Sequence, residues 1–166
     1  MKKVLVAASF TLISLLSACS TESSQNVSEP SQNSGVSSNP QQDGEEFLTK
    51  KKSEAGVKTL ASGLMYKVIK SGTGKTPKLT DSVTTHYRGT FINGKEFDSS
   101  YSRNEPTTFP VNGVIKGWTE ALQLMKEGDK WELYIPSNLA YGEAGNSPVI
   151  PPNSALVFEL DLIKVN

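Results

Sequence analysis

Few side chains in this 166-residue sequence are suited to covalent or metal chemistry. The chain has one histidine, His86, and one cysteine, Cys19. These two residues are too few for a zinc site and exclude a disulfide framework, so we expect neither a metal nor any other cofactor. No acidic residue neighbours His86, and no Gly-x-Ser-x-Gly sequence offers a nucleophilic serine. The sequence therefore argues against a hydrolase and favours a structural role for His86 in a strand.

Two glycine-rich segments contain parts of phosphate-binding motifs without completing one. Residues 74–76 (GKT) match the end of a P-loop, but Ile69 stands where that motif needs its first glycine. Residues 72–74 (GTG) match the start of a dinucleotide-binding pattern, but Pro77 replaces the third glycine. Both segments are therefore predicted to be turns. The chain has 17 basic and 17 acidic residues, a balance that argues against nucleic-acid binding through a basic face.

Aromatic residues beside glycines, prolines and polar groups are the remaining candidates for a site. Eleven of the 13 aromatic residues lie between Tyr66 and Phe158. Five of them belong to a set of six short segments, which are 83–89 (VTTHYRG), 93–100 (NGKEFDSS), 114–118 (VIKGW), 140–142 (AYG), 150–153 (IPPN) and 156–160 (LVFEL). Taken singly, any of these rings is as well explained by core packing. Their order and spacing carry the information.

In this order and spacing, the six segments resemble the FKBP-type peptidyl-prolyl cis-trans isomerases over roughly residues 60–166. The resemblance implies an enzyme that isomerises X–Pro bonds in exported proline-containing polypeptides by stabilising a twisted amide non-covalently in an apolar pocket. It also implies binding of macrolide immunosuppressant-type ligands. The alternative is a non-catalytic peptide-binding or chaperone module that uses the same pocket. Residues 47–48 and 56–60 resemble the macrophage-infectivity-potentiator branch, whose long dimerisation helices are missing here, so we expect a monomer.

The resemblance assigns site roles residue by residue. The implied catalytic residues are Tyr87, Phe97, Asp98, Ile115, Trp118, Tyr141 and Phe158, and the implied further substrate-binding residues are Val114, Arg103, Phe109, Val149 and Ile150. In this assignment Trp118 is the floor under a substrate proline, and Tyr141 and the Ile115 N–H bind peptide carbonyls. Thr107 and Asn146 depart from the family pattern, where a wall phenylalanine and a flap histidine are common. These departures affect the expected shape of the pocket rim.

Hydrophobic periodicity predicts the elements that position these residues. Strands are expected at 64–69, 83–91, 131–135 and 156–162, with the Asn93-Gly94 turn connecting the second of them to residues 95–97. Trp118, Ala121, Leu122 and Met125 share one face of a short helix that Gly128 ends. The pattern predicts an α+β fold with an antiparallel sheet on one helix, and the resemblance makes that sheet a half-barrel wrapped around the helix.

The N-terminal residues predict export and a lipid anchor. A basic start at residues 1–3 precedes a 15-residue apolar run at 4–18, typical of a secretory signal. Leu16-Ser17-Ala18-Cys19 resembles a bacterial lipobox, which implies acylation of Cys19. Ser20 lacks the aspartate typical of inner-membrane retention. We therefore expect an exported protein that is lipid-anchored to a bacterial membrane, the outer membrane facing the periplasm in preference to the inner membrane, or to the cell surface.

The expected organisation has four parts. Residues 1–18 form the signal peptide, and residues 19–44 form a disordered tether after the acylated cysteine, rich in Ser, Gln and Asn. Residues 45–59 are a short charged lead-in, with a possible short helix at 45–54. Residues 60–166 form the isomerase domain.

Overall fold

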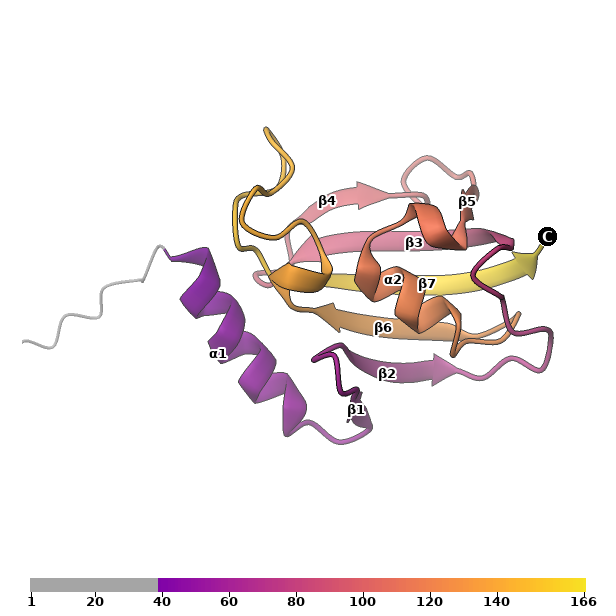
Figure 1. The fold of residues 1–166 in the computed structure, drawn as a ribbon, viewed down its shortest axis with the longest axis horizontal. Coiled ribbons are helices and arrows are strands. Elements are labelled where there is room, and N and C mark those ends of the chain that lie inside the picture. Colours follow the sequence, from indigo (N-terminus) through magenta and orange to yellow (C-terminus); the bar gives the residue numbers. More distant parts are fainter. Residues whose placement is uncertain (1–38) are drawn as a thin grey trace, which may run out of the picture. The chain divides into compact units, whose positions relative to one another are not determined.

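The computed structural model describes residues 39–166, which form one antiparallel sheet with two α-helices (Figure 1). In chain order the elements are α1 (Pro40–Lys52), β1 (Val57–Thr59), β2 (Met65–Lys70), β3 (Ser82–Phe91), β4 (Glu96–Ser99), β5 (Thr107–Pro110), the 3₁₀ helix η1 (Val111–Gly113), α2 (Lys116–Leu122), β6 (Lys130–Ile135), the 3₁₀ helix η2 (Ser137–Leu139) and β7 (Leu156–Val165). The expected signal peptide, Cys19 and most of the expected tether lie outside the described residues.

The strands pair in the order β1-β2-β6-β7-β3-β4. Strand β5 pairs with residues 82–85 of β3, before the part of β3 that pairs with β4. Every pairing is antiparallel, which confirms the fold class expected from the alternating sequence pattern. The connection between β3 and β4 is the expected tight turn. Gly94 adopts a φ of +83° there, a conformation that glycine reaches without a steric cost.

The core lies between the sheet and α2, which crosses one face of β3 and β7 (Figure 1). On β7 the apolar residues Leu156, Phe158, Leu160 and Leu162 are buried, and they alternate with half-buried residues that include Glu159 and Asp161. This alternation follows from the two-residue period of a strand and confirms the prediction for residues 156–162. The expected helix is also present, and Met125 is buried just beyond its end.

The possible short helix at 45–54 is present as α1, but residues 40–44, expected to be the end of the disordered tether, belong to it as well. The helix α1 already begins at Pro40, and the Asn39 side chain caps it by accepting a 3.1 Å hydrogen bond from the Gln41 N–H. Gly44 is buried, and a Cβ added to it would lie 3.0 Å from the Ala155 Cβ. A small residue therefore lets α1 lie against the segment before β7, which composition alone did not indicate.

The start of the domain also lies earlier in the chain than expected. β1 pairs with β2 from Val57 to Thr59, so the sheet begins inside the segment assigned to the lead-in. Phe47 of α1 contacts Tyr134 of β6 edge-on, with 6.2 Å between ring centroids. The lead-in is therefore part of the folded domain.

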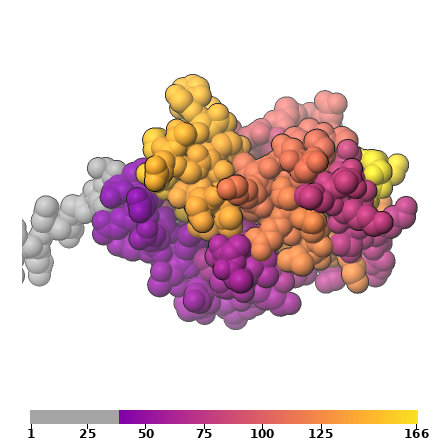
Figure 2. Space-filling view, viewed as in Figure 1, coloured from indigo at the N-terminus to yellow at the C-terminus, as the bar shows by residue number. Residues whose placement is uncertain are grey.

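A long loop between η2 and β7 protrudes beside α2 as the gold segment at the edge of the molecule (Figure 2). Hydrogen bonds between Asn146 and Ile150 close this loop on itself, because each backbone N–H donates to the other residue's carbonyl at 2.8 Å. The loop carries Tyr141 at its start, beside the pocket described next.

Candidate active site

A cavity of about 390 Å³ opens between the sheet, η1 and the start of α2. Most of its lining side chains are aromatic or aliphatic, and the complete set is Tyr87, Phe97, Asp98, Phe109, Gly113, Val114, Ile115, Trp118, Tyr141 and Phe158. A mostly apolar cavity with a few polar groups at its edge is the usual form of a small-ligand or peptide site.

Trp118 forms the floor of this pocket. Only 4% of its surface is exposed, and its ring is met edge-on by Tyr87 at 5.3 Å, Phe158 at 5.2 Å and Phe109 at 5.8 Å between centroids. Edge-to-face contacts of this kind hold aromatic rings in fixed orientations. The preceding residue, Gly117, permits the arrangement, because a Cβ there would lie 2.7 Å from Ile135 Cγ2.

Phe97 and Phe158 form a wall above the floor. Their ring centroids are 5.5 Å apart, and the rings are nearly perpendicular. Both rings occupy space that a side chain at Gly89 would need. A Cβ at Gly89 would lie 2.6 Å from Phe97 Cζ and 2.7 Å from Phe158 Cε1. The pocket wall therefore depends on glycine at this position in β3.

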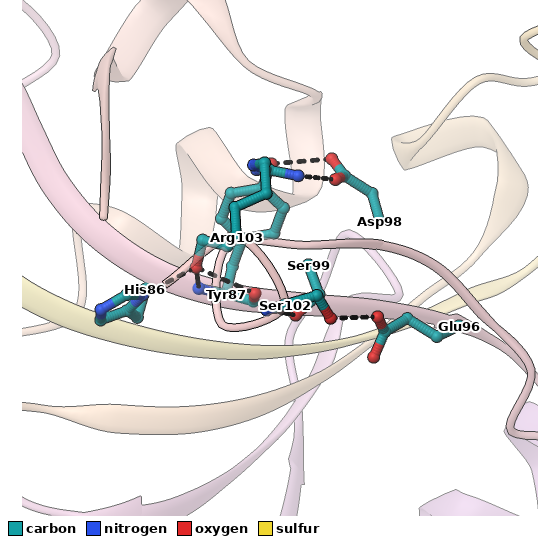
Figure 3. Close-up of polar contacts among 8 residues, drawn as sticks. His86, Tyr87, Glu96, Asp98, Ser99, Ser102 and Arg103 are labelled. Carbon is teal, nitrogen blue, oxygen red and sulfur yellow. Dashed lines mark hydrogen bonds and ion pairs between the residues drawn. The ribbon is translucent and has the colours of Figure 1, made fainter. Parts of the chain in front are cut away.

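Three polar side chains form the rim (Figure 3). The Tyr87 hydroxyl donates to Asp98 Oδ2 at 2.7 Å, and Arg103 donates to Asp98 Oδ1 at 2.5 Å and to the Tyr87 oxygen at 2.8 Å. Burial acts to raise the pKa of the Asp98 carboxyl, but hydrogen bonds from Tyr87 and Arg103 outweigh it, so the pKa is lowered. Burial, and then the bond to Asp98, raises the pKa of Tyr87. The rim thus holds an ionised carboxylate beside a neutral phenol at neutral pH.

Two further polar groups of the pocket are donors. Burial, followed by the charge of Asp98, raises the pKa of the Tyr141 hydroxyl, so this group stays protonated at neutral pH. The backbone N–H of Ile115, between η1 and α2, donates to no other group within residues 39–166. The Ile115 N–H is therefore available to a carbonyl oxygen of a bound chain, and Tyr141 lines the same pocket.

The structure brings together nine of the twelve residues that the sequence assigned to the site. These are Tyr87, Phe97, Asp98, Phe109, Val114, Ile115, Trp118, Tyr141 and Phe158. Arg103 does not line the cavity but supports Tyr87 and Asp98 from outside it. Val149 is 50% exposed on the protruding loop, Ile150 is buried in the core, and neither lines the cavity. Gly113, which the sequence assignment omitted, completes the lining.

The departure at Thr107 has a structural explanation. β5 pairs with β3 so that Phe109 stands opposite Val83, which places its ring on the same face as Val83 and Tyr87. The ring of Phe109 lies 5.8 Å from that of Tyr87 and lines the pocket. Phe109 thus supplies an aromatic wall from a position two residues after Thr107.

His86 lies outside the pocket lining, in agreement with its expected place in a strand. Its Nδ1 is 2.9 Å from Ser100 Oγ, and its ring stacks on Tyr101 with centroids 4.7 Å apart. Within residues 39–166, no group of three His, Cys, Asp or Glu side chains is arranged to hold a metal ion. None of the helices in this part of the chain is long and apolar enough to span a membrane.

Two family models match the chain. The model described as FKBP-type peptidyl-prolyl cis-trans isomerase matches residues 73–163, and the model described as the domain amino terminal to FKBP-type peptidyl-prolyl isomerase matches residues 15–68. The first match spans all ten residues that line the pocket.

Among curated proteins, the chain is 57% identical over 119 residues to peptidyl-prolyl cis-trans isomerase Mip of Coxiella burnetii, covering 72% of this chain and 52% of that protein. It is 52% identical over 122 residues to the FKBP-type isomerase FkpA of Escherichia coli K12, covering 74% of this chain and 45% of that protein. The chain therefore spans about half the length of these curated relatives.

Solved structures show the same fold. The crystal structure of FkpA from Escherichia coli superposes with a TM-score of 0.74 at 50% identity, covering 76% of this chain and 59% of that one. A peptidyl-prolyl cis-trans isomerase from Pseudomonas syringae superposes with a TM-score of 0.72 at 40% identity, covering 76% of this chain and 93% of that one.

Proposed function

The chain belongs to the FKBP-type family of peptidyl-prolyl cis-trans isomerases, and on that premise we propose that it accelerates cis–trans rotation about X–Pro bonds of exported polypeptides. The observation that carries this proposal is the pocket itself, in which Trp118 is enclosed by edge-on aromatic rings beside the Tyr87–Asp98–Arg103 rim.

The reaction requires no bond to be made or broken. Rotation about a peptide bond has a barrier of about 18–20 kcal/mol, because the twisted amide loses its resonance. The twisted amide also has less charge separation than the planar one. An apolar cavity therefore stabilises it relative to the planar amide, and this preference for the transition state lowers the barrier.

Each part of the pocket has a task in this mechanism. The floor at Trp118 accepts the proline ring, and Phe97 and Phe158 cover the amide from the side. The Ile115 N–H and the Tyr141 hydroxyl hold carbonyl oxygens of the flanking chain, which keeps one side of the bond fixed while the other rotates. Asp98 is occupied by hydrogen bonds from Tyr87 and Arg103, so it shapes the rim and has no role as a base.

An isomerisation assay with a proline-containing peptide and the chain from residue 20 onward tests this proposal. Unaided X–Pro isomerisation takes tens to hundreds of seconds, so catalysis is directly visible as a faster approach to equilibrium. Acceleration that rises linearly with protein concentration supports an isomerase. A peptide that binds in the pocket but isomerises at the uncatalysed rate would instead identify a non-catalytic peptide-binding or chaperone module.

The proposed setting is a bacterial membrane surface facing an exported compartment, with lipid on Cys19 as the anchor. Residues 16–19 support it through their similarity to a lipobox, and one relative, 48% identical over 122 residues, is named outer membrane protein MIP of Legionella longbeachae. More than one acyl chain gives stable membrane attachment without a spanning helix. The preferred location is the periplasmic side of the outer membrane.

Two finer proposals concern partners. The protein is proposed to be a monomer, and the support for this is the Ser-, Gln- and Asn-rich composition of residues 20–44. Light scattering at twice the monomer mass would contradict this. The aromatic pocket is also proposed to bind macrolide ligands that mimic a twisted prolyl amide.

A further inference from the structure

The loop that supplies the rim residue Arg103 has little burial of its own. It follows β4, which carries Asp98 and ends at Ser99, and the residues from Tyr101 to Pro106 are all exposed. Ser100, at the start of the loop, is completely buried. The position of Arg103 beside Asp98 therefore depends on how Ser100 is held.

Ser100 is bonded to the backbone of Tyr87 on β3. The Tyr87 N–H donates to Ser100 Oγ at 2.7 Å, and the Ser100 N–H donates to the Tyr87 carbonyl at 2.9 Å. The same hydroxyl lies 3.1 Å from that carbonyl and 2.9 Å from His86 Nδ1. The Ser100 side chain thus extends the β3–β4 pairing by one residue, at the point where β4 leaves the sheet.

His86 contacts this loop from the face opposite the pocket. Adjacent residues of a strand point to opposite faces, so Tyr87 lines the cavity while His86 faces away from it. In Figure 3, His86 lies at the left, and Arg103 and Asp98 lie above it and to its right. Its contacts with the loop are the Nδ1–Ser100 bond and the stacked ring of Tyr101.

We propose that His86 and Ser100 are positioning residues, which fix the loop that carries Arg103 beside Asp98 and Tyr87 and so hold the pocket rim in its active geometry. This inference rests on the proposed isomerase function for its effect on rate. The essential contact is the hydrogen bond between His86 Nδ1 and the hydroxyl, and the stacking on Tyr101 is secondary. Neither residue contacts the substrate.

The test separates the hydrogen bond from the stack with two substitutions of the half-buried His86. His86→Phe keeps a ring for Tyr101 and loses the Nδ1 contact, whereas His86→Asn keeps a polar atom near the Nδ1 position and loses the stack. We expect His86→Phe to lower kcat/KM by about two- to 12-fold, the range for one lost hydrogen bond. We expect His86→Asn to keep most of the wild-type kcat/KM. Both variants should remain folded, as cooperative melting curves will show.

A double-mutant comparison tests whether His86 acts through Ser100. Ser100→Ala should lower kcat/KM more than His86→Phe does, because it also leaves the buried Tyr87 N–H without its partner. Adding His86→Phe to Ser100→Ala should cause no further loss. Losses that multiply in the double variant, or a His86→Phe enzyme as active as wild type, would overturn the proposal.

An NMR measurement tests the inference independently of the isomerisation assay and of the Ser100→Ala variant. The Arg103 guanidinium is held by two contacts in the wild type, so its NMR resonances should be sharp. They should broaden or shift in His86→Phe and recover in His86→Asn. If the wild-type chain fails to accelerate isomerisation, the proposed function is wrong, and the Arg103 signal alone decides the positioning role. An Arg103 signal that is unchanged in His86→Phe would contradict it.

Discussion

The Tyr87 hydroxyl donates a 2.7 Å hydrogen bond to Asp98, which stands opposite Gly89, and not opposite Tyr87, in the β3–β4 pair. Tyr87 lies two residues from Gly89 and therefore on the same face of β3. The phenol and the carboxylate therefore meet diagonally across the strand pair. Gly89, between them in the register, leaves room for the two rings of the wall.

The lowered pKa of Asp98 predicts a pH-dependent contribution to stability. Folding favours the ionised carboxylate, so the contribution is fully present above the usual pKa of 3.8 and is lost as pH falls through the lower folded value. We expect wild type to melt at a higher temperature than Asp98→Asn at neutral pH, and this difference to shrink below about pH 4. Melting curves of both proteins across pH measure it. A difference that stays constant into strong acid would contradict the assigned pKa shift.

Gly89→Ala is predicted to disable the pocket through its wall. The new methyl group overlaps Phe97 and Phe158, and rings displaced by such a contact lower kcat/KM by about tenfold or more. Gly94→Ala is the matched control. It places a left-handed backbone under strain of about 1–2 kcal/mol, but its Cβ meets no atom within 4 Å. The control should lose stability and keep its catalytic rate, whereas equal activities in the two variants would contradict the wall assignment.

We predict that the fluorescence of Trp118, and not that of Trp131, reports ligand binding. A macrolide that enters the pocket contacts Trp118 and should change its fluorescence in a saturable way. Trp131 is stacked on Tyr66 with centroids 4.2 Å apart, outside the pocket lining, so Trp131→Phe should keep the signal. Trp118→Phe should lose it. A saturable change that disappears in Trp131→Phe would place the ligand elsewhere.

Lipid anchoring is predicted to depend on a single thiol. Replacing Cys19 with serine removes the proposed acylation site, so the variant should move from the membrane or detergent phase into a soluble or unprocessed form. Fractionation of cells that express the wild type and the Cys19→Ser protein measures this. Wild-type protein found entirely in the soluble fraction would contradict the anchor.

The sheet and most of the pocket were predictable, because the relevant signals are local. The alternation of β7 identifies a strand with one buried face, and the Asn93-Gly94 pair identifies the hairpin after β3. The motif order then placed Trp118, Tyr87 and Phe158 in one pocket, where the structure has them.

The residues that the structure places outside the cavity lining, or earlier in a helix than expected, are ones whose place depends on packing. Val149 and Ile150 are neighbours in the same motif, but the closed loop exposes the first and buries the second in the core. The start of α1 had a usable signal, since Asn39 followed by Pro40 is a typical helix beginning. The polar residues around Asn39 instead suggested a disordered segment. Helix α1 contacts the rest of the domain at Gly44 and Phe47, and these two positions do not form the broad apolar face by which a sequence reveals a packed helix.

The most direct test of non-covalent catalysis is kcat/KM for Asp98→Ala and Tyr141→Phe, with melting temperatures to show that each variant is folded. Each change removes polar contacts and no bond-forming group, so we expect a loss of about 1–3 kcal/mol, or roughly five- to 150-fold in rate. An enzyme that uses a nucleophile or a general base behaves differently. A loss beyond about four decades at either residue in a folded variant would contradict stabilisation of a twisted amide and point to covalent or acid–base chemistry.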